Sequence, residues 1–192
     1  GAYPSPFRYA DVVTSTTHKT LRGPRGAVIF SRNDKRELPK KINKAVFPGL
    51  QGGPHINQTA AAAVAFKEAT GASFTTYAKK VVENANVLAE ELSARGWRVV
   101  SGGTDSHLLL VDTWMDGNPS TELRAGGIPG AEASDRLEKK GIIVNKNTIP
   151  GEARKPFDPS GIRIGTAAET TRGAGKKEMK EIAEKIDRVL KR

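Results

Sequence analysis

Short apolar runs with β-branched residues alternate with stretches at helical spacing, and this pattern predicts the elements of the first third of the chain. Ala10–Ser15 and Ala27–Ser31 are apolar and bounded by glycine or proline, which predicts two strands. The glycines and prolines of Phe47–Pro54 predict a loop that turns sharply and exposes backbone amides. An alanine-rich helix is predicted over Thr59–Ala69, with a break at Gly71.

The rest of the chain predicts further helices and strands. One helix ends at Gly96 and carries apolar residues at helical spacing, namely Tyr77, Val81, Ala85, Leu88 and Leu92. Another is predicted over Ala131–Lys140, and the apolar face of a closing helix is formed by Met179, Ile182, Ala183, Ile186, Val189 and Leu190. Strands are predicted at Trp97–Val100, Leu108–Val111, Ile142–Val144 and Gly161–Gly165, and a loop at Asn118–Gly130.

The long helical region is predicted to separate two domains. The first, residues 1–74, contains the two early strands, and the second, residues 75–192, has enough apolar residues to form its own core. A turn of sequence SGGTDS joins two of the later strands and indicates a hairpin or an adjacent pair. The predicted fold class is therefore α/β, with a small antiparallel sheet in the second domain.

Composition excludes several classes of protein. No apolar run approaches the roughly 20 residues of a membrane span, and no signal segment is visible, so we expect a cytoplasmic protein without membrane contact. The absence of cysteine excludes disulfides, thiolate metal sites and cysteine nucleophiles. His55 and His107 lack the spaced partners of a metal triad, so no metal is predicted.

The net charge of +10 favours anionic partners. The basic residues of Arg32–Lys44 and Lys176–Arg192 alternate with carboxylates and lack interleaved aromatic residues. Single-strand binding requires aromatic stacking beside the charge, so nucleic acid is not an expected partner.

A lysine, Lys19, follows the first predicted strand within STTHKTLRGPRG, between hydroxyls and an imidazole. Only the free amine forms a Schiff base with a carbonyl, so a reactive lysine needs desolvation or neighbouring cations to lower its pKa. His18, Arg22 and Arg25 are close in sequence. A solvated lysine between a strand and a turn is the competing interpretation.

Two further features suit small anions. Arg163 is flanked by Ile162 and Ile164 in a predicted strand, so its guanidinium lies on the opposite face and can bind a carboxylate through two hydrogen bonds. The backbone amides of Gly52 and Gly53 can approach a phosphate closely, and glycine also permits the dihedrals of an anion-binding nest. A surface ion pair and an ordinary turn are the alternatives.

Five sequence blocks, in order and spread along the chain, resemble the serine hydroxymethyltransferase family. They are STTHKTLRGPRG, INKAVFPGLQGGPH, SGGTDSHLLLVD, VNKNTIPG and SGIRIGTAAETTRG. The resemblance implies a fold-type I enzyme that uses pyridoxal 5'-phosphate and interconverts serine and glycine while transferring a one-carbon unit to or from tetrahydrofolate. The cofactor supplies the electron sink in such enzymes, and the protein supplies position and electrostatics.

The resemblance also implies roles for individual residues. Lys19 corresponds to the Schiff-base lysine, with His18 beside it and the hydroxyls of Thr16 and Thr17 assisting the exchange of lysine for substrate amine. Arg163 corresponds to the arginine that binds the substrate carboxylate. Arg25 is assigned to the cofactor, and Gly52 and Gly53 to the loop whose amides reach the cofactor phosphate of the neighbouring subunit. Phe47 corresponds to a position near the same surface between subunits, and Asn147 to a position that contacts folate.

The family pattern places about half of the protein before Gly1, including an aspartate for the pyridine nitrogen and a histidine for the ring. The resemblance therefore implies the C-terminal portion of an oligomeric enzyme, part of the sheet of its large domain plus its small domain, inactive alone and completed by an N-terminal half. Two alternatives are another cofactor-dependent aldolase, such as a threonine aldolase, and a non-catalytic binding or assembly module. The aldolase is not expected to carry the LQGGP and NKNTIP blocks together.

Overall fold

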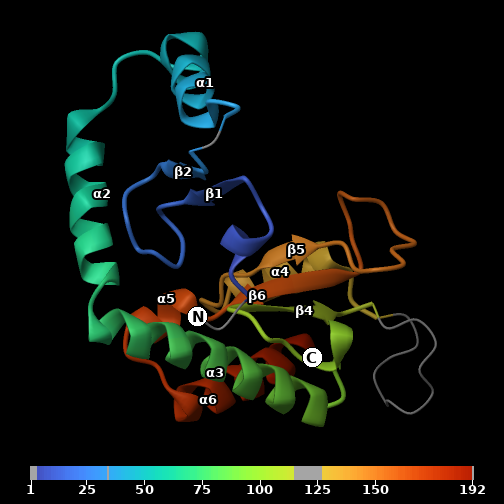
Figure 1. Ribbon diagram of the computed structural model, residues 1–192. Coiled ribbons are helices and arrows are strands. Elements are labelled where there is room, and N and C mark those ends of the chain that lie inside the picture. The colour runs from blue at the N-terminus through green and yellow to red at the C-terminus, as the bar shows by residue number, and fades with distance from the viewer. Residues whose placement is uncertain (1–3, 34, 115–126, 192) are drawn as a thin grey trace. The chain divides into compact units, whose positions relative to one another are not determined.

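The computed structural model describes residues 4–33, 35–114 and 127–191, and the chain divides into two compact units. Unit 1 ends at Thr76 and unit 2 begins at Tyr77, so the division falls within one helix, α3 (Ala72–Ala94). Figure 1 follows the elements from the blue N-terminal strands to the red C-terminal helix. Both units combine helices with small antiparallel sheets, which confirms the mixed α/β class.

Unit 1 is built on a two-stranded antiparallel hairpin. Strands β1 (Val12–Thr16) and β2 (Ala27–Ser31) pair from Val12 opposite Ser31 to Thr16 opposite Ala27. The other elements are η1 (Pro6–Arg8), α1 (Leu38–Lys44), the irregular helical turn η2 (Ala45–Leu50) and α2 (Ile56–Ala69). The peptide bond between Phe47 and Pro48 is cis. The hairpin holds the Lys19 segment as its connection.

Unit 2 contains a four-stranded antiparallel sheet in the order β3-β4-β6-β5. The strands are β3 (Arg98–Val99), β4 (Leu108–Asp112), β5 (Asn145–Asn147) and β6 (Gly161–Gly165). The turn η3 (Val100–Gly102) follows β3, and the helices besides α3 are α4 (Gly130–Glu138), α5 (Ala167–Thr171) and α6 (Lys176–Leu190). Since β5 is an edge strand, it pairs only with β6.

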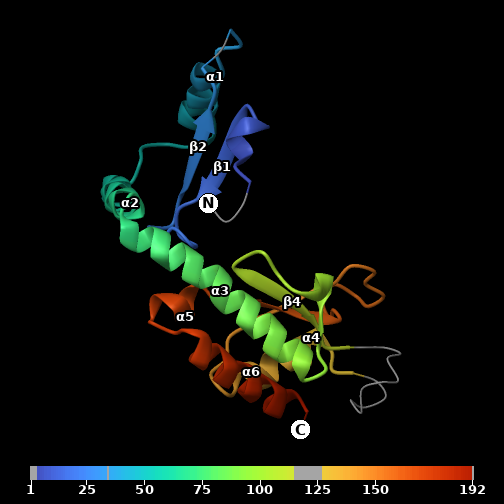
Figure 2. The same ribbon diagram turned by 60° about the horizontal axis from the view of Figure 1, so that its bottom comes forward.

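The core of unit 2 lies between one face of this sheet and helices α3, α4 and α6. Alternate residues of β4 and β6 point into it, namely Leu109, Val111, Ile162 and Ile164. Helices α3 and α6 lie side by side in both views (Figures 1 and 2), and the carboxylate of Glu91 pairs with the ammonium of Lys180 at 3.3 Å between them. The opposite sheet face carries Arg163, with the half-buried Leu110 of β4 as its cross-strand neighbour.

Unit 1 has no comparable core among its described residues. Among the residues described in this unit, Ala65 is the single buried apolar one, whereas many of the large apolar side chains are exposed: Phe7, Tyr9, Val12, Ile29, Phe30, Phe47, Leu50, Ile56, Val64 and Phe66. A hairpin and short helices that bury this little apolar area have too weak a hydrophobic driving force to fold in isolation. Unit 1 thus depends on additional packing surface for stability.

Most of the elements expected from sequence are confirmed, with shifts of one to three residues at their ends. The strand predicted at Ile142–Val144 is wrong. The N–H of Ile142 donates to the carbonyl of Leu137 and closes the end of α4, while Val144 is buried in the core. Pairing with β6 begins at Asn145, opposite Arg163, so polar residues form the strand. The loop predicted at Asn118–Gly130 falls mostly outside the described residues.

Truncating a core side chain should destabilise unit 2 specifically. Leu137 is fully buried between α4 and the sheet, so Leu137→Ala is expected to lower the unfolding free energy by about 2–5 kcal/mol. Ile143 is 84% exposed, so Ile143→Ala should change it by less than about 0.5 kcal/mol. Urea unfolding followed by circular dichroism measures both, and equal losses would contradict this assignment of the core.

Candidate functional site

The segment that carries Lys19 is closed by hydrogen bonds to Thr17. The Thr17 N–H donates to the carbonyl of Gly26 at 2.9 Å, and the Thr17 carbonyl accepts from the N–H of Gly23 at 2.8 Å. The Thr17 hydroxyl donates to the carbonyl of Pro24 at 2.6 Å. Thr17 is 3% exposed, and these contacts satisfy its buried polar groups. The connection between β1 and β2 therefore has a defined shape.

A tight turn places Lys19 at the outer side of this connection. The N–H of Arg22 donates to the carbonyl of Lys19 at 2.9 Å, and Arg22 adopts the left-handed conformation with φ of 59°. Its guanidinium lies 5.7 Å from the ring centre of Phe74, a cation–π contact. Lys19 itself is exposed. Non-glycine residues with positive φ are uncommon, so the contacts around Arg22 hold the turn.

Close packing beneath the turn explains one of its glycines. A Cβ at Gly23 would lie 2.8 Å from the Thr17 carbonyl oxygen and 3.1 Å from the Cβ of Ala65 on α2. The neighbouring His18 is half-buried, and its Nδ1 is buried with no hydrogen-bond partner among the described residues. A buried ring nitrogen of this kind is a free donor or acceptor beside Lys19.

An open cleft of about 1150 Å³ lies within unit 1, along the start of β2, η2 and the start of α2. Five of the residues predicted from sequence line it: Thr17, Arg25, Phe47, Gly52 and Gly53. Thr16, His18 and Lys19 are outside its lining; Thr16 is the last residue of β1, and His18 and Lys19 lie on the adjoining connection. The fold therefore brings two distant sequence blocks, around residues 17–25 and 47–53, to one surface.

The cleft is positively charged on its walls. Arg25 and Lys44 line it and attract an anion such as a phosphate, and the imidazole of His55 lines it as well. Sequence reasoning had missed Lys44 and had treated His55 as an ordinary polar residue. The turn η2 places both beside the hairpin, and no local sequence pattern predicts this placement.

Gly52 and Gly53 are exposed, and a Cβ at either would meet no atom of this chain within 4 Å. Neither glycine has a positive φ. The left-handed dihedrals expected for an anion-binding nest are therefore not found. The space beside these glycines is open to a ligand or to another chain. The remaining reason for glycine at these positions is that such a group can approach the backbone closely.

Arg163 and Asn147 occupy the open face of the sheet in unit 2. Arg163 lies opposite Leu110 on β4 and opposite Asn145 on β5, while its neighbours Ile162 and Ile164 are buried, which confirms the predicted alternation. Its Nη2 donates to Oδ1 of Asn145 at 3.3 Å. Asn147 lies opposite Gly161, on the same face as Asn145. The exposed guanidinium is thus positioned to bind a carboxylate.

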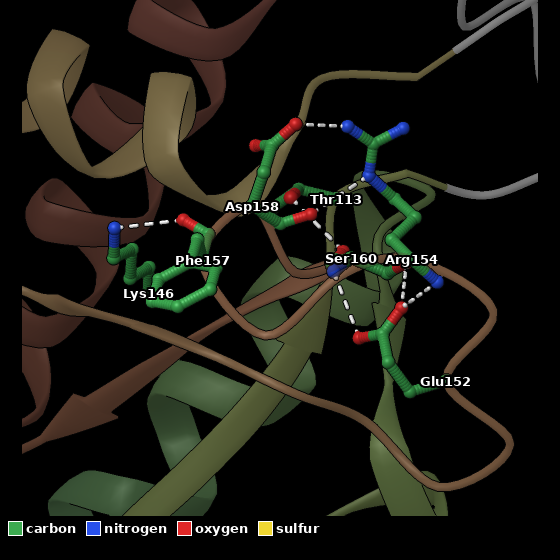
Figure 3. Close-up of polar contacts among 7 residues, drawn as sticks. All are labelled: Thr113, Lys146, Glu152, Arg154, Phe157, Asp158 and Ser160. Atoms are coloured by element: carbon green, nitrogen blue, oxygen red, sulfur yellow. Dashed lines mark hydrogen bonds and ion pairs between the residues drawn. The ribbon is translucent and has the colours of Figure 1, made fainter.

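The connection between β5 and β6 is held by a half-buried carboxylate, Glu152 (Figure 3). One oxygen accepts from the N–H of Arg154 at 2.8 Å and from the hydroxyl of Ser160 at 2.7 Å. The other accepts from the N–H of Ser160 at 2.9 Å and from the N–H of Ile149 at 3.3 Å. Burial alone would raise the pKa of Glu152, but these bonds to Ser160, Arg154 and Ile149 outweigh it and lower the pKa to about 2.

A second set of contacts anchors the same connection to β4. The carbonyl of Ser160 accepts from the N–H of Thr113 at 2.9 Å and from the N–H of Trp114 at 3.1 Å. Arg154 pairs with Asp158, and its guanidinium lies 3.9 Å from the ring centre of Trp114. Lys146 donates to the carbonyl of Phe157 at 2.8 Å (Figure 3). A connection of this length is therefore ordered by polar contacts.

The predicted site residues thus form two groups, one on the hairpin and cleft of unit 1 and one on the sheet face of unit 2. Among the described residues, no group of three or more histidine or acidic side chains is placed to hold a metal ion. Within the same ranges no helix is both long enough and apolar enough to cross a membrane.

Glycine at position 161 should be required by packing. A Cβ there would lie 2.6 Å from Cγ2 of Ile149 and 2.8 Å from the carbonyl oxygen of Val111, so Gly161→Ala is expected to cost about 1–3 kcal/mol. At Gly165, on the same strand, the nearest atom would be 3.8 Å away, so Gly165→Ala is the matched control. Urea unfolding compares them, and equal stability would contradict the packing argument.

The stability that Glu152 provides should depend on pH. Because folding lowers its pKa from 4.5 to about 2, its contribution is complete above pH 4.5 and is lost as the pH falls toward 2. The difference in unfolding free energy between the unchanged chain and Glu152→Gln should therefore be largest near about pH 7 and much smaller near about pH 3. Denaturant titrations at both values measure it.

The control for this pH experiment is Glu184→Gln, which makes the same chemical change at an exposed ion pair with Arg188. Exposed pairs contribute little, so the control should change the unfolding free energy by less than about 1 kcal/mol. If Glu152→Gln changes the unfolding free energy by the same amount at both pH values, the lowered pKa assigned to Glu152 is wrong.

Comparison with known proteins gives a consistent result. Residues 1–186 match the profile of the family described as Serine hydroxymethyltransferase. The serine hydroxymethyltransferase of Wolbachia pipientis subsp. Culex pipiens is 53% identical over 190 residues, covering 99% of this chain and 42% of the relative. The serine hydroxymethyltransferase of Acidothermus cellulolyticus is 53% identical over 189 residues, which cover 98% of this chain and 41% of the relative. That of Desulfotalea psychrophila is 52% identical over 190 residues, which cover 99% of this chain and 42% of the relative.

The chain therefore spans about two fifths of the length of the curated relatives it matches. The match extends over nearly all of its own residues, through both groups of predicted site residues. A likeness of this extent decides the family and disfavours the alternative of a threonine aldolase. The chain belongs to the serine hydroxymethyltransferase family.

Proposed function

We propose that this chain supplies the lysine-bearing and carboxylate-binding parts of a pyridoxal phosphate enzyme of fold type I. The enzyme interconverts serine and glycine and transfers a one-carbon unit to or from tetrahydrofolate. The observation that carries the proposal is the cleft of unit 1, where Thr17, Arg25, Phe47, Gly52 and Gly53 meet beside the Lys19 connection. The division at residues 74 and 75 is proposed as the boundary between the large-domain part and the small domain.

The residues present in unit 1 fit the cofactor. Lys19 is an exposed primary amine on a shaped connection, suited to attach to an aldehyde. Arg25 and the open backbone at Gly52 and Gly53 offer donors for a phosphate at the adjoining cleft. When bound, pyridoxal phosphate supplies the electron sink for bond cleavage at the amino acid's Cα.

Other side chains of the same connection have supporting roles in this proposal. The buried, unpartnered Nδ1 of His18 is available to hold a proton beside Lys19. The half-buried Thr16 offers a hydroxyl that can bond the incoming substrate amine. The hydroxyl of Thr17 is occupied by the carbonyl of Pro24, so Thr17 contributes mainly by fixing the shape of the connection.

Unit 2 supplies the substrate groups. Arg163 presents a planar guanidinium on an exposed sheet face, where it can bind the amino acid carboxylate through two parallel hydrogen bonds. Fixing that carboxylate orients the bonds of the substrate's Cα. Asn147, on the same face, offers an amide to the folate, which is itself anionic and agrees with the net charge of +10.

The site is proposed to be incomplete in this chain alone. The chain spans 42% of its relatives' length, and the apolar surface of unit 1 is largely exposed. We propose that an N-terminal part covers that surface and supplies the carboxylate for the pyridine nitrogen, and that the enzyme is a homo-oligomer in which Phe47, Gly52 and Gly53 face a neighbouring subunit. A non-catalytic module with the same surfaces is the second candidate, favoured by the exposed apolar side chains of unit 1.

The proposal predicts selective reaction of Lys19. In a fusion of this chain behind the N-terminal part of the Acidothermus relative, pyridoxal phosphate should produce a visible absorption band, and borohydride should fix the cofactor on Lys19, as found by peptide mass spectrometry. Lys19→Ala should abolish the band. Lys67→Ala, an exposed lysine of α2, is the control and should leave it unchanged.

The same fusion should catalyse cleavage of serine in the presence of tetrahydrofolate, and this activity should be lost in Lys19→Ala. The isolated chain should show little or no turnover. Labelling spread evenly over surface lysines, with no turnover of the fusion, would favour the non-catalytic module. Turnover by the isolated chain at ordinary enzyme rates would overturn the proposed incompleteness.

A further inference from the structure

The segment Thr148–Ser160 joins the two strands that carry Asn147 and Arg163. Connections this long without helix or strand are uncommon in compact domains and usually serve a function. Asn147 lies opposite Gly161 in the β5–β6 pair, so the connection begins and ends at that pair. Whatever fixes the two ends of the connection also fixes the relative position of the strands.

Glu152 bonds both ends. Its carboxylate accepts from Ile149, two residues after Asn147, and from both the N–H and the hydroxyl of Ser160, which immediately precedes Gly161. The chain returns toward Ile149 through Gly151, which has φ of 78°, and the N–H of Glu152 donates to the Ile149 carbonyl at 3.1 Å. A single side chain therefore ties the strand ends together.

Ser160 is held from its other side as well. Its carbonyl accepts from the N–H groups of Thr113 and Trp114 and, at 3.2 Å, from the Thr113 hydroxyl. With its N–H and hydroxyl on Glu152 and its carbonyl on the end of β4, Ser160 is 4% exposed and fixed in orientation (Figure 3). Arg163 follows three residues later along β6.

The position of β6 decides the face on which Arg163 lies. Because side chains alternate along a strand, a slip of one residue would turn Arg163 toward the core and expose both Ile162 and Ile164. β5 has only three residues and no second neighbour, so its own pairing specifies the register weakly. The bonds that Glu152 makes beside the Asn147–Gly161 pair therefore help to specify the register, to which the pairing of β5 itself contributes little.

We propose that Glu152 is a positioning residue, which holds Asn147 and Arg163 in register on the open sheet face by tying Ile149 to Ser160. It acts through these residues, since its oxygens are occupied by main-chain and hydroxyl donors of the connection. Its value for substrate binding rests on the proposed function, in which Arg163 binds the amino acid carboxylate.

The test uses the full chain labelled with ¹⁵N and observed by NMR. Glu152→Gln replaces the carboxylate with a side-chain amide, whose N–H₂ group is itself a donor, at a point where other donors converge. The backbone N–H groups of Asn145–Asn147 and Gly161–Gly165 should therefore exchange hydrogen with solvent at least about tenfold faster, relative to those of α6. The side-chain signals of Arg163 and Asn147 should shift. Glu152→Asp keeps the charge and should restore part of the protection.

Two further variants keep the result interpretable. Leu137→Ala lowers the stability of unit 2 through the core, so it should speed exchange across the whole unit without a selective effect on β5 and β6. Ser160→Ala removes one donor to Glu152 and should act in the same direction as Glu152→Gln, to a smaller degree. Unchanged exchange and unchanged Arg163 signals in both Glu152→Gln and Ser160→Ala would overturn the proposal.

A glycine titration of the Arg163 Nε–H signal connects position to binding. In the fusion with the N-terminal part of the Acidothermus relative, glycine should shift this signal saturably, and Glu152→Gln should raise the glycine dissociation constant at least about tenfold, whereas Glu184→Gln should not. If glycine does not shift the signal in the fusion while Glu152→Gln still loosens β5 and β6, the proposed function fails and the positioning role stands. Equal glycine affinity in a loosened variant would overturn the link to binding.

Discussion

The antiparallel pairing of β6 with both β4 and β5 is the constraint on which the rest of unit 2 depends. It directs Ile162 and Ile164 into the core with Leu109 and Val111, and the same alternation puts Arg163 on the opposite face. The pairing of β6 therefore sets both the packing of the core and the sheet face on which the guanidinium lies. The register cannot change at one face without changing at the other.

The two ends of β6 are controlled by different physical means. Toward its beginning, Gly161 leaves no room for a side chain against Ile149 and Val111, and the Glu152 carboxylate ties the preceding residue to the connection. Toward its end, Gly165 has space around it, and the following Thr166 donates its hydroxyl to the carbonyl of Val81 on α3. Steric fit and charge thus act at the end of β6 that pairs with Asn147, the last residue of β5.

Unit 1 differs from unit 2 because its candidate site has a defined shape while its apolar side chains are not packed into a core. Its connection around Thr17 and its cleft are defined by backbone hydrogen bonds and turns, while its apolar side chains remain exposed. In the proposed function a further part of the enzyme covers this surface, and the chain spans about two fifths of the length of its relatives.

The sequence by itself determined the strands, the main helices, the alternation around Arg163 and the family, because these depend on local period and on blocks of adjacent residues. It failed at Ile142–Val144, where apolar residues close the end of α4 and cover the core instead of pairing. The nest dihedrals that glycine permits at Gly52 and Gly53 are not found. Only the tertiary structure decided that Thr17 and Arg25 line one cleft with Phe47, Gly52 and Gly53. It also decided that Lys44 and His55 join them, and that Glu152 binds Ser160. The reason is that these contacts form between segments far apart along the chain or across a long irregular connection, where no periodic pattern specifies which donor meets which acceptor.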